Sequence, residues 1–348
     1  MTGARRTALL VCPGRGTYNK DELGYLARHH AEKPVLLEAM DGERRRLRQT
    51  SLQSLDSTER YSVAQHTRGD NASLLIHACA RGDVLDIDTD QFEIVAATGN
   101  SMGWYIALSC TGVVSEVDGA RIVNTMGTYM QEALIGGQIV YPLVNDQWQV
   151  IPGRRSEVLE LAVSITASGQ GYAGLSIDLG GMLVLAGDEP GLAALTDRLD
   201  PVDRFPMRLQ NHAAFHTVLQ TPISERGHQA FSNVVFAPAS IPLIDGRGAI
   251  WRRNVPYGSD IKDYTFGAQV VEPYDFAAAL RVGLREFAPD VVILPGPGST
   301  LGSAIAQTMI AMDWRGISSK DTFLERQASD PVLLSMGRDD QRSLVSRP

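Results

Sequence analysis

Apolar positions along this chain fall into two patterns, the short continuous runs of buried strands and the 3.6-residue spacing of helices. A run at 7–12 ends at Pro13-Gly14-Arg15-Gly16, and a run at 92–98 ends at Gly99-Asn100-Ser101-Met102-Gly103. Each run predicts a strand. Helical periodicity is found at 20–30, 33–48, 72–82, 104–111 and 117–133. Strands that alternate with helices in this way indicate an α/β fold with a parallel sheet.

The stretch from 137 to 209 has a different order of elements. It predicts strand (138–143), helix (156–167), strand (172–178), strand (182–186), helix (189–199) and strand (205–209). This βαββαβ order is typical of a ferredoxin-like α+β unit. The α/β pattern then resumes with a helix at 276–287, a strand at 290–294 and a helix at 301–312. The predicted fold class is therefore α/β, with a hydrolase-like core around a parallel sheet (1–134 and 210–348) and an inserted ferredoxin-like subdomain (135–209).

Composition narrows the classes of function. The 348 residues carry a net charge of −8, which argues against a nucleic-acid-binding protein. No apolar segment reaches the length of a membrane span. The three cysteines (Cys12, Cys79 and Cys110) show no disulfide framework, so we expect reduced thiols and a cytoplasmic protein. Histidines and cysteines are not spaced as zinc ligands, and the turn at 295–298 lacks the lysine of a phosphate-binding loop, so we expect no metal or nucleotide site.

Gly99-Asn100-Ser101-Met102-Gly103 has the G-x-S-x-G pattern of a nucleophile elbow. The serine of such an elbow lies on a sharp turn between a strand and a helix, so the residues two positions before and after it must be small. The turn exposes the hydroxyl and directs the N–H group of Met102, at the start of a helix, toward a developing oxyanion. A predicted strand before the motif and a predicted helix after it support Ser101 as a nucleophile.

The base for this serine cannot be chosen by spacing. Seven histidines are present, and a histidine beside an apolar run is more often structural than catalytic. His77 lies within such a run, and His212 lies four residues before His216. All three remain candidates on spacing alone.

Several segments, in order, give the chain a resemblance to a known family. They are Pro13-Gly14-Arg15-Gly16, Gly99-Asn100-Ser101-Met102-Gly103, Met126-Gly127-Thr128-Tyr129-Met130-Gln131-Glu132-Ala133, Ala213-Ala214-Phe215-His216-Thr217, and Gly296-Pro297-Gly298 with Leu301. The sequence resembles the malonyl-CoA:acyl-carrier-protein transacylases and the acyltransferase domains of fatty acid and polyketide synthesis. The resemblance extends to about residue 312, and it is the order of the segments that makes it specific.

The resemblance implies a role for each matching residue. Ser101 would be acylated by an acyl-CoA, and His216 would be its general base. The backbone N–H groups of Met102 and Arg15 would form the oxyanion hole, and a backbone carbonyl near 294–297 would orient the histidine. It also implies a monomer that binds no cofactor, with acyl-CoA as the donor and the phosphopantetheine of an acyl carrier protein as the acceptor.

The acyl-binding positions implied by the resemblance are Met126, Asn100, Arg15 and Phe215, and three of them depart from the family pattern. Malonyl transacylases have an arginine where this chain has Met126, and that arginine pairs with the substrate carboxylate. Arg121 is about 140° away around the helix and cannot replace it. A carboxylate buried against methionine is costly, so the sequence favours a neutral acyl group. Asn100 replaces a histidine, and Arg15 replaces a glutamine.

Arg15 leaves two interpretations open. It would either return a positive charge to the site from another direction or be an inert charge that points outward. The sequence favours the second interpretation, because the oxyanion role uses only the backbone of this residue. Trp104 also departs from the family, which usually has an acidic residue there. It would either fill the space left by the substrate carboxylate or, as we favour, pack against the core.

The sequence leaves three functions open, the first two of which use the same predicted catalytic residues. The first is acyl transfer from CoA to a carrier protein by a ping-pong route through acyl-Ser101. The second is hydrolysis of acyl groups from carrier proteins on the same fold, and the third is a non-catalytic protein that only binds a carrier protein. Because carrier proteins are acidic, the acyl-transfer function requires a local basic surface on this net-acidic protein. Arg154-Arg155 and Arg252-Arg253 are the candidates.

Overall fold

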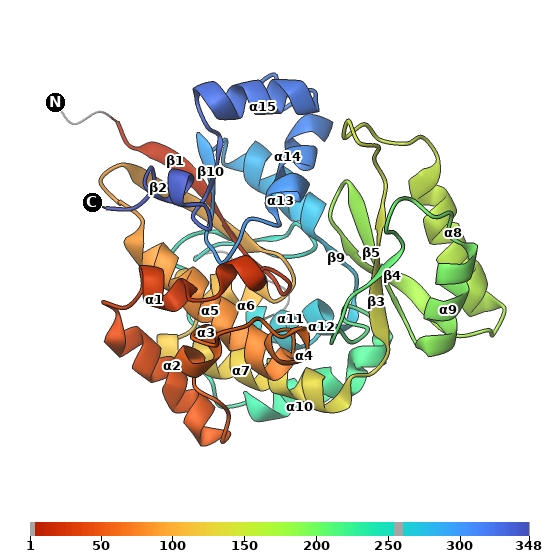
Figure 1. Ribbon diagram of the computed structural model, residues 1–348, viewed down its shortest axis with the longest axis horizontal. Coiled ribbons are helices and arrows are strands. Elements are labelled where there is room, and N and C mark those ends of the chain that lie inside the picture. Colours follow the sequence, from red (N-terminus) through yellow and green to blue (C-terminus); the bar gives the residue numbers. More distant parts are fainter. Residues whose placement is uncertain (1–3, 254–259, 348) are drawn as a thin grey trace.

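The computed structural model describes residues 4–253 and 260–347, which form two units side by side (Figure 1). The larger unit is built around a six-stranded sheet and the smaller one around a five-stranded sheet. Within the described ranges, no helix combines the length and the apolar character needed to cross a bilayer.

The larger sheet has the order β11-β10-β1-β2-β7-β8. Its strands are β1 (Arg6–Cys12), β2 (Phe92–Gly99), β7 (Leu243–Ile244), β8 (Ile250–Trp251), β10 (Val291–Leu294) and β11 (Leu333–Ser335). Neighbouring strands are parallel except at the edge, where β8 is antiparallel to β7. Side chains of β1 alternate between the two faces: Ala8 and Leu10 belong to one core, Leu9 and Val11 to the other. Because helices cover both faces, the strand is apolar and buried from Ala8 to Cys12.

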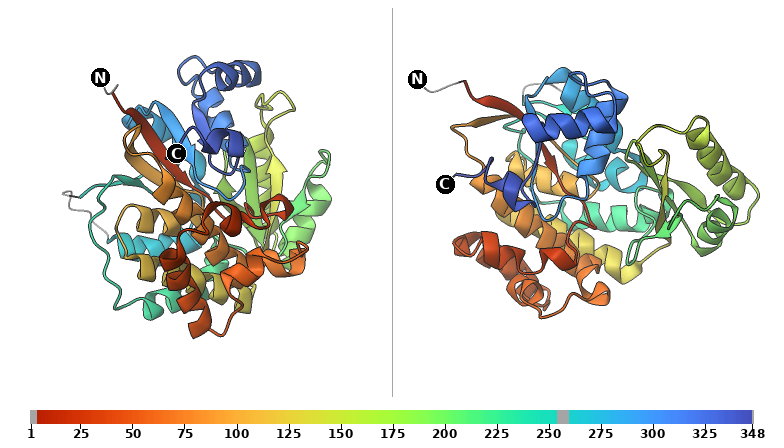
Figure 2. Two further views of the ribbon diagram at one scale, coloured as in Figure 1. Left: turned by 60° about the vertical axis from the view of Figure 1, so that its left-hand side comes forward. Right: turned by 45° about the horizontal axis from the view of Figure 1, so that its top comes forward.

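Helices lie on both sides of this sheet (Figures 1 and 2). The core on one side draws on α1 (Tyr25–His29), α2 (Pro34–Arg46), α3 (Leu52–Asp56), α5 (Gly69–Asp86), α6 (Gly103–Cys110), α7 (Glu116–Ala133), α10 (Thr221–Ala230), α11 (Ile261–Phe266) and α12 (Ala268–Val271). The core on the other side draws on α13 (Phe276–Glu286), α14 (Gly302–Ala311) and α15 (Lys320–Ser329). The short helices α4 (Val63–His66) and α16 (Asp339–Arg342) lie near the surface.

The smaller sheet has the order β6-β3-β5-β4-β9. It contains β3 (Gly137–Pro142), β4 (Ala173–Asp178), β5 (Met182–Gly187), β6 (Met207–Arg208) and β9 (Tyr274–Asp275), with α8 (Arg154–Ala167) and α9 (Glu189–Arg198) on its outer face. The first four strands have the ferredoxin-like order that the sequence predicts. The inner-face residues Val140, Ile177 and Val184 join a core of the larger unit, so the two units share buried surface.

The predicted fold class is confirmed, and the differences concern short strands. No pattern in the sequence indicates β7, β8, β9 or β11, each of which has two or three residues. Such strands are too short to show a period of two, and pairing with neighbouring strands determines them. β9 is the most consequential difference, because it comes from beyond residue 210 and extends the smaller sheet alongside β4. The subdomain boundaries at 135 and 209 therefore stay a prediction.

A buried carboxylate ties the C-terminal segment to the larger unit. Asp83 is fully buried and accepts hydrogen bonds from Arg342 (2.6 Å), Tyr25 (2.7 Å) and the backbone N–H of Gly296 (2.6 Å), and His30 Nε2 lies 3.0 Å away. Burial alone would raise the pKa of Asp83, but the bonds and charges of His30 and Arg342 lower it. The network joins α1, α5, α16 and the turn after β10.

We expect Arg342→Met to lower the free energy of unfolding by about 3 kcal/mol, because it leaves the buried Asp83 carboxylate without its cation. Urea unfolding followed by circular dichroism measures the change. Arg326→Met is the matched control, since Arg326 forms an exposed i,i+4 pair with Asp330 that contributes less than about 1 kcal/mol. Equal effects of the two substitutions would contradict this role of Arg342.

Candidate active site

Ser101 lies between β2 and α6 in a turn that requires glycine on both sides. Its φ of 54° is in the left-handed region, which carries strain for a residue with a side chain. A Cβ at Gly99 would lie 2.2 Å from the backbone of Gly103, and a Cβ at Gly103 would lie 2.3 Å from the carbonyl oxygen of Cys12. Only glycine allows this approach of β1, β2 and α6, and the turn has the geometry of a nucleophile elbow.

The structure brings Ser101 and His216 together. Ser101 Oγ lies 2.7 Å from His216 Nε2, and His216 Nδ1 lies 2.7 Å from the backbone oxygen of Gln269. Because a carbonyl only accepts, Nδ1 carries the proton and Nε2 is left to accept the proton of the serine. The prediction that a carbonyl near 294–297 orients the histidine is wrong. The carbonyl comes from α12, which is held beside His216 by a bond from the histidine backbone N–H to Val270 (2.9 Å).

Burial keeps His216 neutral. The side chain is fully buried, and burial lowers its pKa to about 4, against a smaller opposing effect of the bond to Gln269. A neutral imidazole can accept a proton, and the low pKa keeps it neutral throughout the physiological range.

Gln269 also fixes the elbow through its side chain. Its Nε2 donates to the carbonyl oxygen of Ser101 (3.1 Å), and its Oε1 accepts from the hydroxyl of Tyr105 (2.9 Å). One residue therefore positions both the histidine and the serine. The sequence carried no signal for it, because any residue can supply a backbone carbonyl.

Two backbone N–H groups beside Ser101 are unpaired. The N–H groups of Met102 and Arg15 have no acceptor among the described residues, and both residues line the same cavity as Ser101. Met102 precedes the first turn of α6, where the partial positive charge of a helix favours a negative group. Two free donors beside a nucleophilic serine can stabilise an oxyanion.

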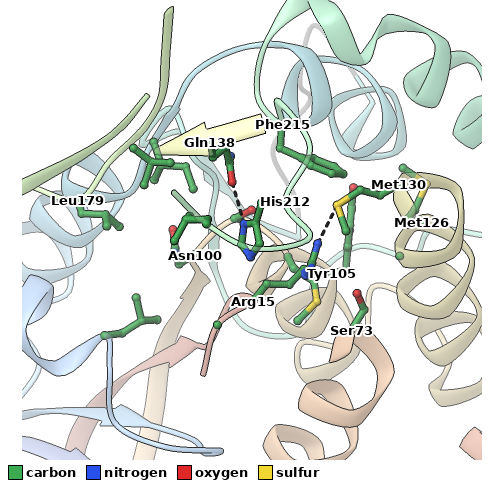
Figure 3. A pocket seen from close by; sticks show the side chains of 18 of the residues that line it. Arg15, Ser73, Asn100, Tyr105, Met126, Met130, Gln138, Leu179, His212 and Phe215 are labelled. Atoms are coloured by element: carbon green, nitrogen blue, oxygen red, sulfur yellow. Dashed lines mark hydrogen bonds between the residues drawn. The ribbon is translucent and has the colours of Figure 1, made fainter. Parts of the chain in front are cut away.

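A cavity of roughly 260 Å³ opens beside Ser101 between the two units (Figure 3). One wall comes from α5, α6 and α7 and includes Ser73, Tyr105, Val123, Met126 and Met130. The other wall includes Gln138, Val140, Ile177 and Val184 of the smaller sheet, together with Phe215. Asn100 also lines the cavity, and its buried Oδ1 has no partner among the described residues. All four predicted acyl-binding positions therefore face one cavity.

The helix α7 offers no cation to this cavity. Met126 is buried and lines it, whereas Arg121 lies over the ring of Phe231, 5.7 Å from its centroid. Trp104 is fully buried outside the cavity and donates to Thr265 Oγ1 (2.9 Å), so it packs against the core as the sequence favoured.

The prediction that Arg15 points outward is wrong. Its side chain lines the cavity, and Nη2 donates to the carbonyl oxygens of Thr67 and Asn211 (2.9 Å for the latter). The loop of Asn211 contributes Leu209 and His212 to the cavity, and the carbonyls of Thr67 and Asn211 draw the side chain inward. The loop sequences gave no sign of this arrangement.

His212 is the cavity residue that the sequence left undecided. Its Nδ1 lies 2.8 Å from Gln138 Oε1, while Gln138 Nε2 donates to Ser176 and Ser176 donates to the carbonyl of Phe215. Burial, and then the charge of Arg15, lower the pKa of His212 well below its usual value. His77 is instead fully buried within α5 and does not line the cavity.

Solved structures of known proteins share this fold across nearly the whole chain. A malonyl-CoA:acyl carrier protein transacylase from Xanthomonas oryzae has a TM-score of 0.75 at 16% identity and covers 99% of this chain and 100% of its own. A malonyl-transacylase in complex with its type II polyketide synthase acyl-carrier protein has a TM-score of 0.72 at 17% identity, with coverages of 97% and 98%. The chain has the malonyl-CoA:acyl-carrier-protein transacylase fold.

Sequence relatives are consistent with the transacylase fold. The chain is 26% identical over 255 residues to the mycoketide-CoA synthase of Mycobacterium tuberculosis, which covers 65% of this chain and 6% of that protein. It is 25% identical over 155 residues to the malonyl CoA-acyl carrier protein transacylase of Salmonella typhimurium, covering 42% of this chain and 46% of the relative. No family model matches the chain. The predicted resemblance is confirmed, and the predicted class of enzyme, an acyltransferase, is the class of these transacylases.

The described part of the transacylase fold also groups three potential metal ligands, which spacing did not indicate. They are His30, Glu32 and Asp86. Asp86 is already paired with Lys33 (2.7 Å) and Arg342 (3.0 Å). Two cations at this carboxylate make the group part of an ion-pair network rather than a cation site.

We expect Ser101 to react with a fluorophosphonate probe at a rate that falls only as the pH drops through about 4. Below its pKa, His216 is protonated and cannot accept the proton of the serine; above it, the imidazole is neutral. Labelling rates between pH 3.5 and 8 measure the midpoint, and His216→Ala is the control that removes the step. A midpoint near 6.5 would show a histidine that burial does not perturb.

Proposed function

We propose that this protein is an acyl-CoA:acyl-carrier-protein S-acyltransferase that works through an acyl-Ser101 intermediate. The observation that carries the proposal is the 2.7 Å contact between Ser101 Oγ and His216 Nε2 within a nucleophile elbow. The similarity in sequence and fold to transacylases supports the same class of reaction.

In the first half-reaction, His216 Nε2 takes the proton of Ser101 as Oγ attacks the thioester carbonyl of acyl-CoA. The N–H groups of Met102 and Arg15 donate to the resulting oxyanion. When the C–S bond breaks, the imidazolium returns its proton to the CoA thiolate. In the second half-reaction, His216 takes the proton of the phosphopantetheine thiol, whose sulfur attacks the acyl-serine, and returns a proton to Ser101 Oγ.

The base works here without a carboxylate. The backbone oxygen of Gln269 accepts a hydrogen bond from Nδ1–H of His216, which fixes the tautomer and the ring orientation. No Asp or Glu is among the described residues that line the cavity. A thiolate is a good leaving group, so the imidazolium needs less stabilisation than in the cleavage of an amide.

The basic pair Arg154-Arg155 is the better placed surface for an acidic carrier protein. Arg155 pairs with Asp178, which lies between two residues that line the cavity, Ile177 and Leu179. Arg252 lies over the ring of Phe287, just after α13, at the amino ends of the parallel strands. Ser101 follows the carboxyl end of β2, so Arg252-Arg253 lies at the opposite ends of the parallel strands from Ser101.

Intact-mass spectrometry after brief exposure to a panel of acyl-CoAs tests the transfer. We expect a serine adduct from at least one donor, its absence in Ser101→Ala, and passage of the acyl group to a holo acyl carrier protein. An adduct that is lost to water at the same rate with or without carrier protein would identify a hydrolase instead. No adduct from any donor, together with no fluorophosphonate labelling, would identify a non-catalytic protein.

A further inference from the structure

The guanidinium of Arg15 is incompletely paired inside the cavity. Nη2 donates to the backbone carbonyls of Thr67 and Asn211, and Nη1 faces the thioether of Met130 at 2.9 Å (Figure 3). Nε is buried without a partner among the described residues. A thioether is a weak acceptor, so the group retains strong donors for an anion.

Among the described residues of the cavity, no negative charge balances this cation. The described lining includes no Asp or Glu. The negative charge of Asp70 raises the pKa of Arg15, but Asp70 is itself paired with Arg68 through hydrogen bonds of 3.0 and 2.8 Å. His212, the other basic group of the lining, is kept neutral by burial and by Arg15. Burial lowers the pKa of Arg15 to about 9, so the side chain is still protonated at pH 7.

Arg15 and Met126 lie on different walls of the same cavity. Met126 is on α7, whereas Arg15 is in the turn that follows β1 and reaches toward Met130, one helical turn beyond Met126 (Figure 3). The cation of this cavity therefore comes from the β1 turn and not from α7. The expectation of a neutral acyl group assumed that no cation faces the cavity.

We propose that Arg15 determines acyl specificity by binding, from the β1 turn, a carboxylate at the far end of the acyl group on Ser101. The substrate class is a monothioester of a dicarboxylic acid, with malonyl as its smallest member. The proposal rests on the proposed acyl transfer and adds a side-chain role to a residue whose backbone N–H serves the oxyanion.

Two other roles of the guanidinium make different predictions. If Arg15 only links the loops of Thr67 and Asn211, its loss would affect all acyl donors alike. If it binds a phosphate of CoA, its loss would also weaken all acyl-CoAs equally, since every donor carries the same phosphates. Only a carboxylate-binding role predicts that the loss of Arg15 affects two donors of the same shape and different charge to different extents.

The test compares malonyl-CoA with isovaleryl-CoA, in which two methyl groups replace the carboxylate oxygens. Rates of Ser101 acylation are measured by intact mass for the wild type, Arg15→Gln and the matched control Arg121→Gln, whose arginine lies outside the cavity. Arg15→Gln keeps the backbone N–H and a polar side chain. We expect wild type and Arg121→Gln to prefer malonyl, and Arg15→Gln to lose about 100-fold in that preference while isovaleryl changes less than about threefold.

A double variant distinguishes the loss of carboxylate binding from a loss of folding. Arg15→Gln with Met126→Arg returns the cation to α7 and is expected to restore malonyl acylation over isovaleryl. A wild type that prefers isovaleryl, or an equal loss of both donors in Arg15→Gln, would overturn the proposal and leave acyl transfer standing. No adduct from any donor would overturn acyl transfer as well.

Discussion

The close approach of three backbones at Ser101 is the constraint on which the rest of the site depends. β1, β2 and α6 meet where a single Cβ at Gly99 or Gly103 would overlap with backbone atoms. The approach forces Ser101 to a positive φ and points its hydroxyl out of the sheet. It also leaves the N–H group of Met102, at the start of α6, without an acceptor in the described part of the chain. Because these consequences follow from one packing contact, Ser101 and the N–H group of Met102 form a rigid unit.

The histidine and the serine are joined through a segment that contains no acid. Gln269 holds His216 with its backbone oxygen and the Ser101 carbonyl with its side chain, so α12 sets the distance between the two groups. A few residues further on, β9 pairs with β4, and the hydroxyl of Tyr274 donates to the carbonyl oxygen of Gly99. The segment 268–275 therefore fixes His216, Ser101 and the smaller sheet relative to one another. We infer that the cleft between the two units is preformed rather than assembled by substrate.

The sequence predicted the parts of the protein that have a local signature. The buried run of β1, the elbow around Ser101 and the βαββαβ order all follow from spacing and composition. The choice of His216 over His212 required the family resemblance, because two histidines four residues apart carry the same signal. The roles of Gln269 and β9 could not be predicted, because any residue can supply the backbone carbonyl that holds His216, a strand of two residues shows no periodicity, and their side-chain bonds join segments distant in sequence. Arg15 was misassigned for a related reason: its direction depends on the carbonyls of Thr67 and Asn211, which are distant in sequence.

The position of a charge in a cavity, more than its presence in a motif, decides what the cavity can bind. The cation of Arg15 lies where the smaller unit, α7 and the β1 turn meet, and neither Asp nor Glu is among the described residues of the lining. With a neutral acyl group, this arginine would stay buried with an unpaired Nε. That burial is unfavourable, because an aliphatic chain offers no hydrogen-bond acceptor. A carboxylate would supply both the charge and the acceptors that the guanidinium lacks. The absence of a cation from α7 is therefore better explained by an acyl group that is held from the β1 turn. It does not require a neutral substrate.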